Sequence, residues 1–423
     1  MMITKPRGTE DVLPSESKLW QYIENTARNV CERYGYSEIR TPVFEHTELF
    51  QRGVGDTTDV VQKEMYTFED KGGRSLTLKP EGTATLVRSY IENSLYANPQ
   101  PTKLSYIIPC FRYEKPQSGR LREFHQFGIE CFGASNPSTD AEVISLAYLF
   151  LKELNLKGIQ LNINSIGCPV CKKDYNEKLR SYFEKYKSEL CPTCLERLEK
   201  NPMRIIDCKS EICSRIAKDA PKMVDHLCTE CSDHFESVKE RLDNMGIEYK
   251  VNPDIVRGLD YYTKTVFEFV SDALGAQSTV CGGGRYSGLV EELGGKPADG
   301  IGFAAGIERL ILVIKKQQED TIKIDQGPDL FVAAMGEKAE IFAQKLIFDL
   351  RKMGICAEQD LCGRSLKAQM KYADKLSAKY SIVIGDTELE ELSATLKNMK
   401  NGETAETALD AECLAAKLLQ EGK

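Results

Sequence analysis

The sequence predicts an α+β protein with a helical insertion and a separate C-terminal α/β domain. Three observations support this prediction. Helix-like and strand-like stretches alternate up to about residue 155, and strand-like runs return after residue 246. The segment between them, residues 168–246, holds eight of the 15 cysteines among charged, helix-forming residues. Beyond residue 328 the pattern reads strand, helix, strand, helix, strand, which is typical of an α/β unit.

The composition indicates a multidomain protein without a membrane segment. A chain of 423 residues with 41% hydrophobic residues can bury more than one core. The sequence has neither eighteen uninterrupted apolar residues nor the apolar stretch of a signal peptide, so we expect a cytoplasmic protein with no membrane association and with reduced cysteines. The net charge of −8 gives no general attraction to polyanions, so a nucleic-acid partner would need local basic patches.

The first elements follow from capping and proline signals. Residues 16–34 predict a helix that Ser15 caps and that Gly35 ends. Residues 37–44 resemble a strand, but Pro42 cannot donate to a central ladder. We therefore expect an edge strand or an interface segment there.

A strand-to-helix corner follows at residues 79–83. A strand, Ser75–Leu78, precedes it, and residues 84–92 predict a helix. Glu81 and Thr83 at this corner can accept hydrogen bonds from an ammonium group, or they can cap the helix. The two roles can coexist, and the sequence leaves both open.

The next elements form a predicted hairpin, with strands at residues 105–114 and 124–133. Side chains alternate along a strand, so Gln126, Gly128 and Glu130 point to one face, where the glycine leaves room for a ligand.

The hairpin also gathers positive charge. Arg112 on the first strand lies close to three cations of the connecting loop, which are Lys115, Arg120 and Arg122. Guanidinium groups suit two-oxygen anions, so a triphosphate is the favoured partner. The alternative is a solvated charged face, which is common on protein surfaces.

Two later segments also favour anion binding. Residues 257–262 place Arg257, Tyr261 and Tyr262 before a β-branched and aromatic strand. Residues 300–310 predict a glycine-rich strand that turns into a helix with Arg309 in its first turn, where phosphate is favoured. Neither a Walker nor a Rossmann glycine pattern occurs, so arginines would hold a nucleotide.

Taken together, these segments resemble the class II aminoacyl-tRNA synthetases, and specifically the histidyl-tRNA synthetase family, over essentially the whole chain. Residues 34–42, 111–133 and 302–310 resemble motifs 1, 2 and 3 of the class. Residues 257–262 and 283–286 resemble the two signatures peculiar to the histidine enzymes. One departure is Ser287, where the family often has aspartate, and we expect little effect on the chemistry.

The resemblance implies a fold and an activity. An antiparallel-sheet catalytic core would cover residues 1–322, interrupted by the inserted subdomain 168–246, and an anticodon-binding domain would cover residues 328–423. The activity would be ATP-dependent attachment of histidine to tRNA(His) through a histidyl-adenylate, with release of AMP and pyrophosphate. ATP with Mg²⁺, histidine and tRNA(His) would be the substrates, and motif 1 would build a homodimer.

The same resemblance assigns roles to individual residues. Catalysis would use three arginines: Arg257, Arg112 and Arg309. Histidine would be bound by Glu81, Gly82, Thr83, Gln126, Glu130, Tyr261, Tyr262 and Tyr286. ATP would be bound by Arg112, Arg120, Gln126 and Arg309. Within this set Glu130 and Tyr262 would recognise the imidazole edge, and the site would contain no metal ligand from the protein.

A second class of protein is also compatible with the resemblance. Some synthetase-like paralogues do not aminoacylate and instead bind histidine as regulatory subunits of the first enzyme of histidine biosynthesis. They typically lack the terminal domain and have degraded signatures, whereas both are intact here. The ligase is therefore the favoured interpretation.

The cysteines of the insertion leave one question open. Cys168-x2-Cys171 and Cys191-x2-Cys194 have the spacing of a zinc ribbon. Cys228-x2-Cys231, together with His234, offers a third ligand pair. The family's chemistry uses no zinc. The sequence therefore leaves two alternatives open: a structural zinc site, or reduced thiols packed among small helices.

The last domain carries a basic stripe at helical spacing, formed by Arg364, Lys367, Lys371, Lys375 and Lys379. Such a stripe can track phosphates. It can equally be a solvated helix face.

Overall fold

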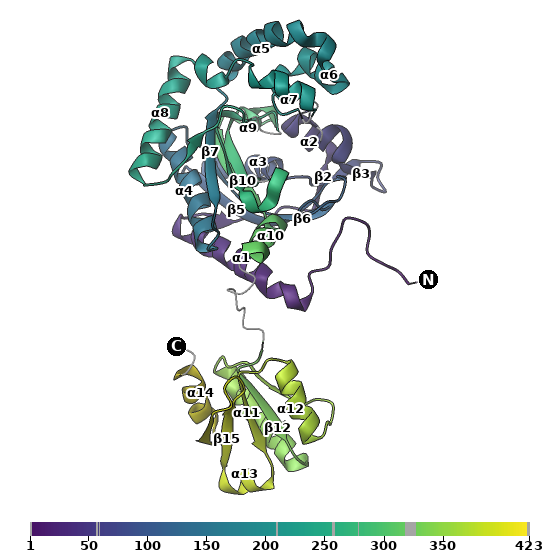
Figure 1. Cartoon of the computed structure of the whole chain (residues 1–423), viewed down its shortest axis with the longest axis vertical. Helices are drawn as coiled ribbons and strands as arrows, with labels where there is room; N and C mark the ends of the chain where they lie inside the picture. Colours follow the sequence, from purple (N-terminus) through teal and green to yellow (C-terminus); the bar gives the residue numbers. More distant parts are fainter. Residues whose placement is uncertain are drawn as a thin grey trace. The chain divides into compact units, whose positions relative to one another are not determined.

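The computed structural model describes residues 2–55, 58, 60–208, 210–255, 259–277, 279–317 and 327–420 (Figure 1). The chain divides into two compact units, Met1–Ile322 and Lys323–Lys423. Within the described ranges, no helix has the length and apolar character needed to cross a membrane.

A largely antiparallel eight-stranded sheet forms the centre of the first unit, with strand order β1-β5-β6-β11-β10-β9-β7-β8. The parallel pairs are at its two edges, β1 with β5 and β7 with β8. The strands are β1 Ser37–Glu38, β5 Thr102–Phe111, β6 Glu123–Phe132, β7 Ile159–Ser165, β8 Lys250–Val251, β9 Thr263–Ser271, β10 Thr279–Ser287 and β11 Asp299–Gly306. This sheet confirms the predicted antiparallel core and the predicted hairpin, β5 and β6.

The two faces of the sheet differ because strand side chains alternate. Phe127 of β6 packs edge-to-face on Phe150 of a covering helix, with ring centroids 4.7 Å apart. Helices on this side are α1 Pro14–Arg33, α4 Pro137–Glu153 and α10 Ile307–Gln317 (Figure 1). Gln126 and Glu130 therefore lie on the opposite face.

The start of α1 differs from the prediction. The expected Ser15 cap is wrong, because the helix begins at Pro14 with Leu13 as its N-cap. Gly35 follows the helix with φ +73, as predicted.

A second, smaller group flanks the open face. It contains a three-stranded sheet of order β2-β4-β3 and three helices. The bounds are β2 Phe44–His46, β3 Tyr66–Glu69, β4 Ser75–Leu78, α2 Thr47–Val54, α3 Thr83–Glu92 and α9 Leu289–Glu292. Of residues 37–44, Ser37–Glu38 forms an edge strand, so the predicted edge position is confirmed for a shorter strand.

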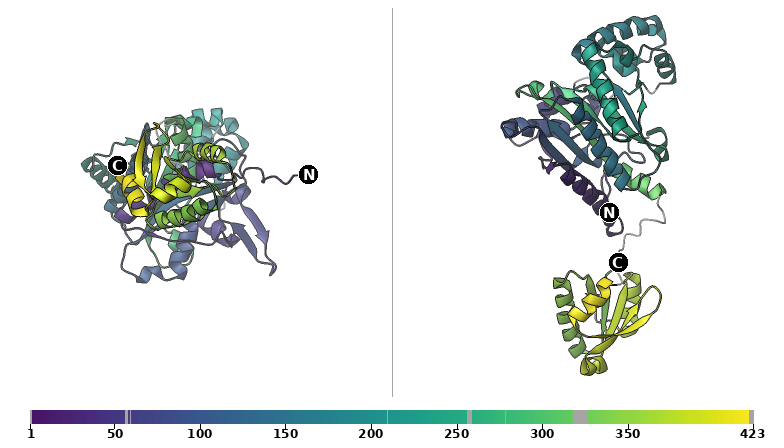
Figure 2. Two further views of the ribbon diagram at one scale, coloured as in Figure 1. Left: turned by 90° about the horizontal axis from the view of Figure 1, so that it is seen from below. Right: turned by 90° about the vertical axis from the view of Figure 1, so that its left-hand side faces the viewer.

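The insertion is helical, as predicted. Its helices are α5 Pro169–Phe183, α6 Pro192–Lys200, α7 Glu211–Lys218 and α8 Thr229–Asn244. Figures 1 and 2 show α5, α6 and α7 grouped beyond one end of the sheet, while α8 runs back along its side. The residues on both sides of the insertion belong to the sheet, since β7 precedes it and β8 follows it.

The C-terminal unit is an α/β fold with a five-stranded sheet of order β13-β12-β14-β15-β16. Its elements are β12 Leu330–Ala334, α11 Glu337–Lys352, β13 Ala357–Gln359, α12 Leu366–Lys375, β14 Tyr380–Ile384, α13 Asp386–Glu391, β15 Ser393–Asn398, β16 Thr404–Ala408 and α14 Ala411–Gln420. The predicted strand–helix–strand–helix–strand order is confirmed, and the elements after Ile384 were not predicted.

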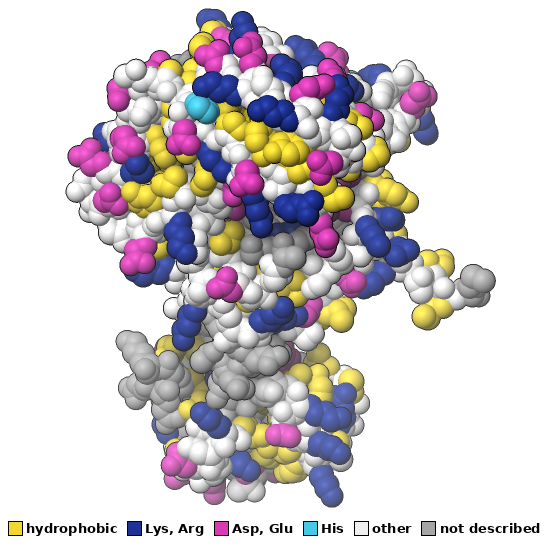
Figure 3. Space-filling model, turned by 45° about the horizontal axis from the view of Figure 1, so that its top comes forward, with side chains coloured by type: hydrophobic (Ala, Val, Ile, Leu, Met, Phe, Trp, Pro, Cys, Tyr) yellow, Lys and Arg dark blue, Asp and Glu magenta, His cyan; other side chains and the backbone are white. Residues whose placement is uncertain are grey.

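The basic stripe of this unit is partly paired. Arg364 forms an ion pair with Asp360, and Lys379 lies 2.9 Å from Asp329. The three remaining lysines on or at the end of α12 are exposed: Lys367, Lys371 and Lys375. Figure 3 shows Lys and Arg side chains gathered along one side of the C-terminal unit.

Candidate active site

A cavity of ≈ 810 Å³ lies on the open face of the sheet and brings together segments that are far apart in sequence. Residues predicted for the site that line it are Glu81, Thr83, Arg112, Arg120, Gln126, Glu130, Tyr261, Tyr262, Tyr286 and Arg309. Gly82 lies behind this wall, against the ring of Tyr106. Arg257 lies outside the described residues.

The cavity wall includes the Glu130 carboxyl, which is 1% exposed. One of its oxygens accepts a hydrogen bond from the Thr83 hydroxyl at 2.6 Å, and the other accepts one from the Tyr286 hydroxyl at 2.6 Å. Burial raises the pKa of Glu130 to about 8, and the charge of Glu81 acts in the same direction against the two hydrogen bonds. A buried acid fixed by two donors can recognise a polar ligand.

Glycines in the neighbouring strands make room for these large side chains. Gly302 of β11 is the cross-strand partner of Glu130, and a Cβ there would lie 1.9 Å from a Glu130 oxygen. A Cβ on Gly300 would lie 2.1 Å from the Tyr286 ring. Both positions therefore require glycine, which explains the glycine-rich sequence that resembles motif 3.

Glu81 stands beside Glu130 and is also buried. Its two oxygens accept hydrogen bonds from the backbone N–H groups of Thr83 and Ala84, both at 2.8 Å. The helix-capping role is therefore present, and the carboxylate still lines the cavity. Burial raises the pKa of Glu81, while these backbone hydrogen bonds oppose the shift.

Tyr106 is a cavity residue that the sequence interpretation missed. It lies opposite Gly128 in the hairpin, and a Cβ on Gly128 would be 2.4 Å from its hydroxyl. The room left by this glycine is therefore filled by the Tyr106 ring, not reserved for a ligand as we expected. The Tyr106 hydroxyl is buried and has no hydrogen-bond partner among the described residues. A buried hydroxyl of this kind is costly unless a ligand pairs with it.

Tyr261, Tyr262 and Tyr286 complete the wall. The Tyr261 and Tyr262 rings lie 4.7 Å apart, and Tyr261 contacts Tyr286 edge-to-face at 5.6 Å. All three side chains are buried. They form an aromatic wall next to Glu130, as expected for a site that holds a flat ring.

Three arginines, Arg112, Arg120 and Arg309, lie close together on the cavity wall. Arg112 is fixed by a hydrogen bond from its Nε to the Pro80 carbonyl at 2.8 Å, and Arg309 donates to the Thr279 carbonyl at 2.6 Å. Arg120 pairs with Glu114 at 2.9 Å. Burial lowers the pKa of Arg309, and the charges of Arg120 and Arg112 act in the same direction. Like charges held this close favour a polyanionic ligand.

Three polar residues near the site have structural roles. Arg285 is 1% exposed and forms a buried ion pair with Asp140 of α4, on the far side of the sheet from Tyr286. His234, considered with the cysteines as a metal ligand, instead lies 3.2 Å from Asp140. The Ser287 hydroxyl donates to the Asp299 carboxylate of the neighbouring strand, so a carboxylate is still present beside this position.

Two family models match the chain, one in each of its two units. The family model described as histidyl-tRNA synthetase matches residues 8–310, and the model described as anticodon binding domain matches residues 329–421. The curated histidine–tRNA ligase of Acetivibrio thermocellus is 60% identical over 412 residues, which cover 97% of this chain and 98% of that protein. The corresponding ligase of Clostridioides difficile is 55% identical over 421 residues, with 99% and 100% covered.

A solved structure gives the same result. The crystal structure of apo S. aureus histidyl-tRNA synthetase matches with a TM-score of 0.83 at 45% identity, covering 99% of this chain and 100% of that one. The sequence match to the family extends through both units of the chain. The chain therefore belongs to the histidyl-tRNA synthetase family.

Proposed function

We propose that this protein attaches histidine to tRNA(His) in two steps, through a histidyl-adenylate formed from histidine and ATP. The observation that carries the proposal is the buried Glu130 carboxyl, hydrogen-bonded by Thr83 and Tyr286, in the same cavity as Arg112 and Arg309. One end of the cavity suits a polar ring, and the other suits phosphates.

Histidine recognition follows from the chemistry of neutral imidazole, which has one N–H donor and one acceptor nitrogen. The Glu130 carboxylate accepts from the donor nitrogen, and a phenol donates to the other. The phenol we assigned from sequence is Tyr262, and the unpaired Tyr106 hydroxyl is a second candidate. An apolar side chain would leave these groups unpaired, and such sites discriminate by about 10⁴ or more.

The histidine ammonium group is held by a second set of contacts. Glu81 supplies the carboxylate next to Glu130, and Gln126 supplies an amide on the same strand face as Glu130. The Thr83 hydroxyl connects the two parts of the site because it donates to Glu130 while its backbone N–H donates to Glu81. Gly82 allows the close packing of this corner on Tyr106.

Arg112, Arg120 and Arg309 bind the phosphates of ATP, and Mg²⁺, when bound with the nucleotide, would supply further positive charge there. Carboxylates on the same wall, Glu268 and Glu308, are oxygen donors of the kind that Mg²⁺ uses.

In the first step a histidine carboxylate oxygen attacks the α-phosphorus, the bond to the bridging oxygen of the β-phosphate breaks, and pyrophosphate leaves. Arg257 neutralises charge that develops at this centre, a role assigned from the resemblance alone. In the second step the terminal adenosine hydroxyl of the tRNA attacks the histidyl carbonyl and AMP leaves. Rate enhancement comes from positioning and from fixed positive charge.

The C-terminal unit binds the anticodon region of the tRNA in this proposal, and the exposed Lys367, Lys371 and Lys375 supply phosphate contacts. The edge strand β1 belongs to the segment that would form a homodimer. A cytoplasmic location, where tRNA charging takes place, is part of the same proposal.

The test is ATP–pyrophosphate exchange with each of the twenty amino acids in turn, followed by charging of tRNA(His). We expect exchange with histidine alone and charging of tRNA(His) but not of a tRNA for another amino acid. Histidine binding without exchange would contradict the ligase and support the regulatory alternative. Exchange with another amino acid would contradict the assignment of the ring-recognition site.

A further inference from the structure

The eight cysteines of the insertion form two separate groups of four. The first, called the Cys168 group, contains Cys168, Cys171, Cys228 and Cys231; the second, called the Cys191 group, contains Cys191, Cys194, Cys208 and Cys213. In each group all four sulfur atoms lie within 4.8 Å of one another. The expected pairing of Cys168 and Cys171 with Cys191 and Cys194 in one ribbon is therefore wrong. In the folded insertion, Cys168 and Cys171 meet Cys228 and Cys231, whereas Cys191 and Cys194 meet Cys208 and Cys213.

We propose that each group binds one structural zinc ion, so that the chain holds two. Zinc binds thiolate sulfur at about 2.3 Å in a tetrahedron, which places neighbouring sulfurs about 3.8 Å apart. The Sγ atoms of Cys168 and Cys171 lie 3.6 Å apart, and those of Cys191 and Cys208 lie 3.8 Å apart. These two sulfur pairs, one in each group, already lie at about the edge length of a zinc tetrahedron.

Other chemistries fit these distances less well. A disulfide requires sulfurs about 2.05 Å apart and joins only two cysteines. A [2Fe–2S] or [4Fe–4S] cluster places several irons and bridging sulfides between its four cysteines, so the cysteine sulfurs must stand farther apart than around a single ion. Thiols that merely pack in a core have no reason to converge in fours on one point, twice in one subdomain.

The backbone around each group is arranged for thiolates. Cys168, Cys191 and Cys228 are the N-cap residues of α5, α6 and α8, so their sulfurs lie at the positive ends of helix dipoles. The Cys228 N–H donates to the Cys171 sulfur at 3.1 Å, and the Cys191 N–H donates to the Cys213 sulfur at 3.3 Å. Hydrogen bonds from backbone N–H groups to ligand sulfurs stabilise the negative charge of a metal–thiolate site.

The insertion also has the architecture that benefits from metal ions. Helices α6 and α7 have only nine and eight residues. Helices of this length are marginal by themselves, and small subdomains commonly use metals as staples. The Cys168 group joins the beginning of α5 to the beginning of α8, and the Cys191 group joins α6 to α7.

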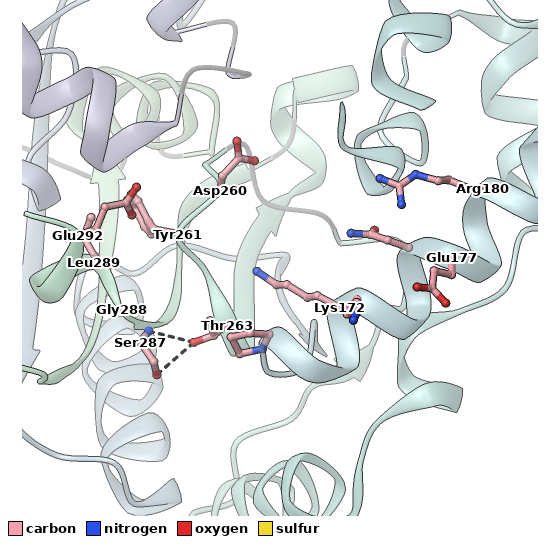
Figure 4. A pocket seen from close by; sticks show the side chains of 13 residues that line it. Lys172, Glu177, Arg180, Asp260, Tyr261, Thr263, Ser287, Gly288, Leu289 and Glu292 are labelled. Atoms are coloured by element: carbon pink, nitrogen blue, oxygen red, sulfur yellow. Dashed lines mark hydrogen bonds between the residues drawn. The ribbon is translucent and has the colours of Figure 1, made fainter. Parts of the chain in front are cut away.

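The two groups also support one wall of the proposed active site. Lys172, which follows Cys171, donates to the Tyr262 carbonyl, and Arg204 lies 2.9 Å from Asp260. Figure 4 shows Lys172 extending from its helix toward the segment of Asp260 and Tyr261, across a hollow of ≈ 590 Å³. Zinc in the insertion would thereby fix the backbone that carries Tyr261 and Tyr262.

The deciding measurement is the metal content of the full-length protein, purified under reducing conditions from cells grown with zinc. We expect two zinc ions per chain, with four sulfur ligands at about 2.3 Å in X-ray absorption. Less than about 0.2 zinc per chain would overturn the proposal, because structural sites are near-stoichiometric. Iron in place of zinc, or a nitrogen or oxygen ligand shell, would also overturn it.

Matched variants assign each ion to its group. Cys171→Ser and Cys213→Ser should each lower the content from two zinc ions to one. The control is a triple variant of the exposed cysteines outside the insertion, Cys356→Ser, Cys362→Ser and Cys413→Ser, which should keep both ions. If a single variant fails to fold, X-ray absorption of the unaltered protein decides. Loss of zinc in the control, or two ions in both single variants, would contradict the assignment.

Discussion

Replacing Glu130 with glutamine tests the recognition of the imidazole ring. Glutamine has the same shape, so the packing against Gly302 and the contacts with the Thr83 and Tyr286 hydroxyls can be retained. The amide removes the negative charge that accepts from the imidazole N–H. A hydrogen bond to a charged group contributes about 1.5–3 kcal/mol, which corresponds to roughly a 10- to 150-fold change. We therefore expect Glu130→Gln to lower kcat/KM for histidine by that factor.

The assay is pyrophosphate exchange with histidine and ATP varied separately. The KM for ATP should change less than about threefold, because Arg112, Arg120 and Arg309 are untouched. Thr83→Val is the matched control for the supporting hydrogen bond, and we expect a smaller loss of about 0.5–1.5 kcal/mol from it. Equal losses for histidine and ATP, or no loss for either, would refute the proposed role of Glu130.

The pH dependence gives the same test a second readout. With a pKa of about 8, Glu130 carries a proton at pH 7 in the free enzyme. If neutral histidine donates to the ionised carboxylate, that proton must leave on binding. The value of kcat/KM for histidine should then rise by up to about tenfold in total from pH 7 and level off above pH 8. Glu130→Gln should lack this rise, and an identical rise in both proteins would contradict the mechanism.

Further predictions concern the neighbouring residues and the stability of the fold. Tyr106→Phe should leave the melting temperature unchanged or raise it, because the variant lacks the unpaired buried hydroxyl. If that hydroxyl contacts the histidine ring, the variant should also have a lower kcat/KM for histidine. A large loss of stability would contradict this prediction. Gly302→Ala should abolish histidine activation, because the new Cβ would lie 1.9 Å from a Glu130 oxygen, and wild-type kinetics would refute the packing argument. Arg309→Gln should raise the KM for ATP at least about tenfold without lowering the melting temperature, because the guanidinium is held among like charges. The pKa of Glu130 is raised from 4.5 to about 8 in the folded state, so the free energy of unfolding decreases as pH rises across that interval. Glu130→Gln should show a smaller decrease in stability with pH, measured by thermal unfolding at several pH values.

Local sequence signals predicted most elements that depend on local physics. The β5–β6 hairpin, the strand Ser75–Leu78 and the helix after the Glu81 corner depend on alternation and capping within a few residues, and all three are confirmed. The Ser15 cap failed because Pro14, with its fixed φ, starts the helix two residues earlier than predicted. The elements after Ile384 were not predicted, although β15 alternates between buried and exposed residues.

Contacts between distant segments were harder to predict. The cysteine spacing could not show that Cys168 and Cys171 meet Cys228 and Cys231, because that pairing depends on how four helices fold back on one another. Tyr106 was missed for the same reason, since its role depends on its position opposite Gly128 in the hairpin. Gly128 indicated that space is needed in the hairpin, but the sequence alone could not show that the Tyr106 ring, and not a ligand, fills that space.

In the proposed complex one cavity holds the histidine ring at Glu130 and the ATP phosphates at the arginines. A crystal structure of the full-length protein with histidine and a non-hydrolysable ATP analogue tests it directly. We predict an imidazole nitrogen within about 3.2 Å of a Glu130 oxygen, with Arg112, Arg309 and Arg257 facing the phosphates. A ring bound away from Glu130, or an Arg257 side chain in bulk solvent far from the nucleotide, would contradict the account.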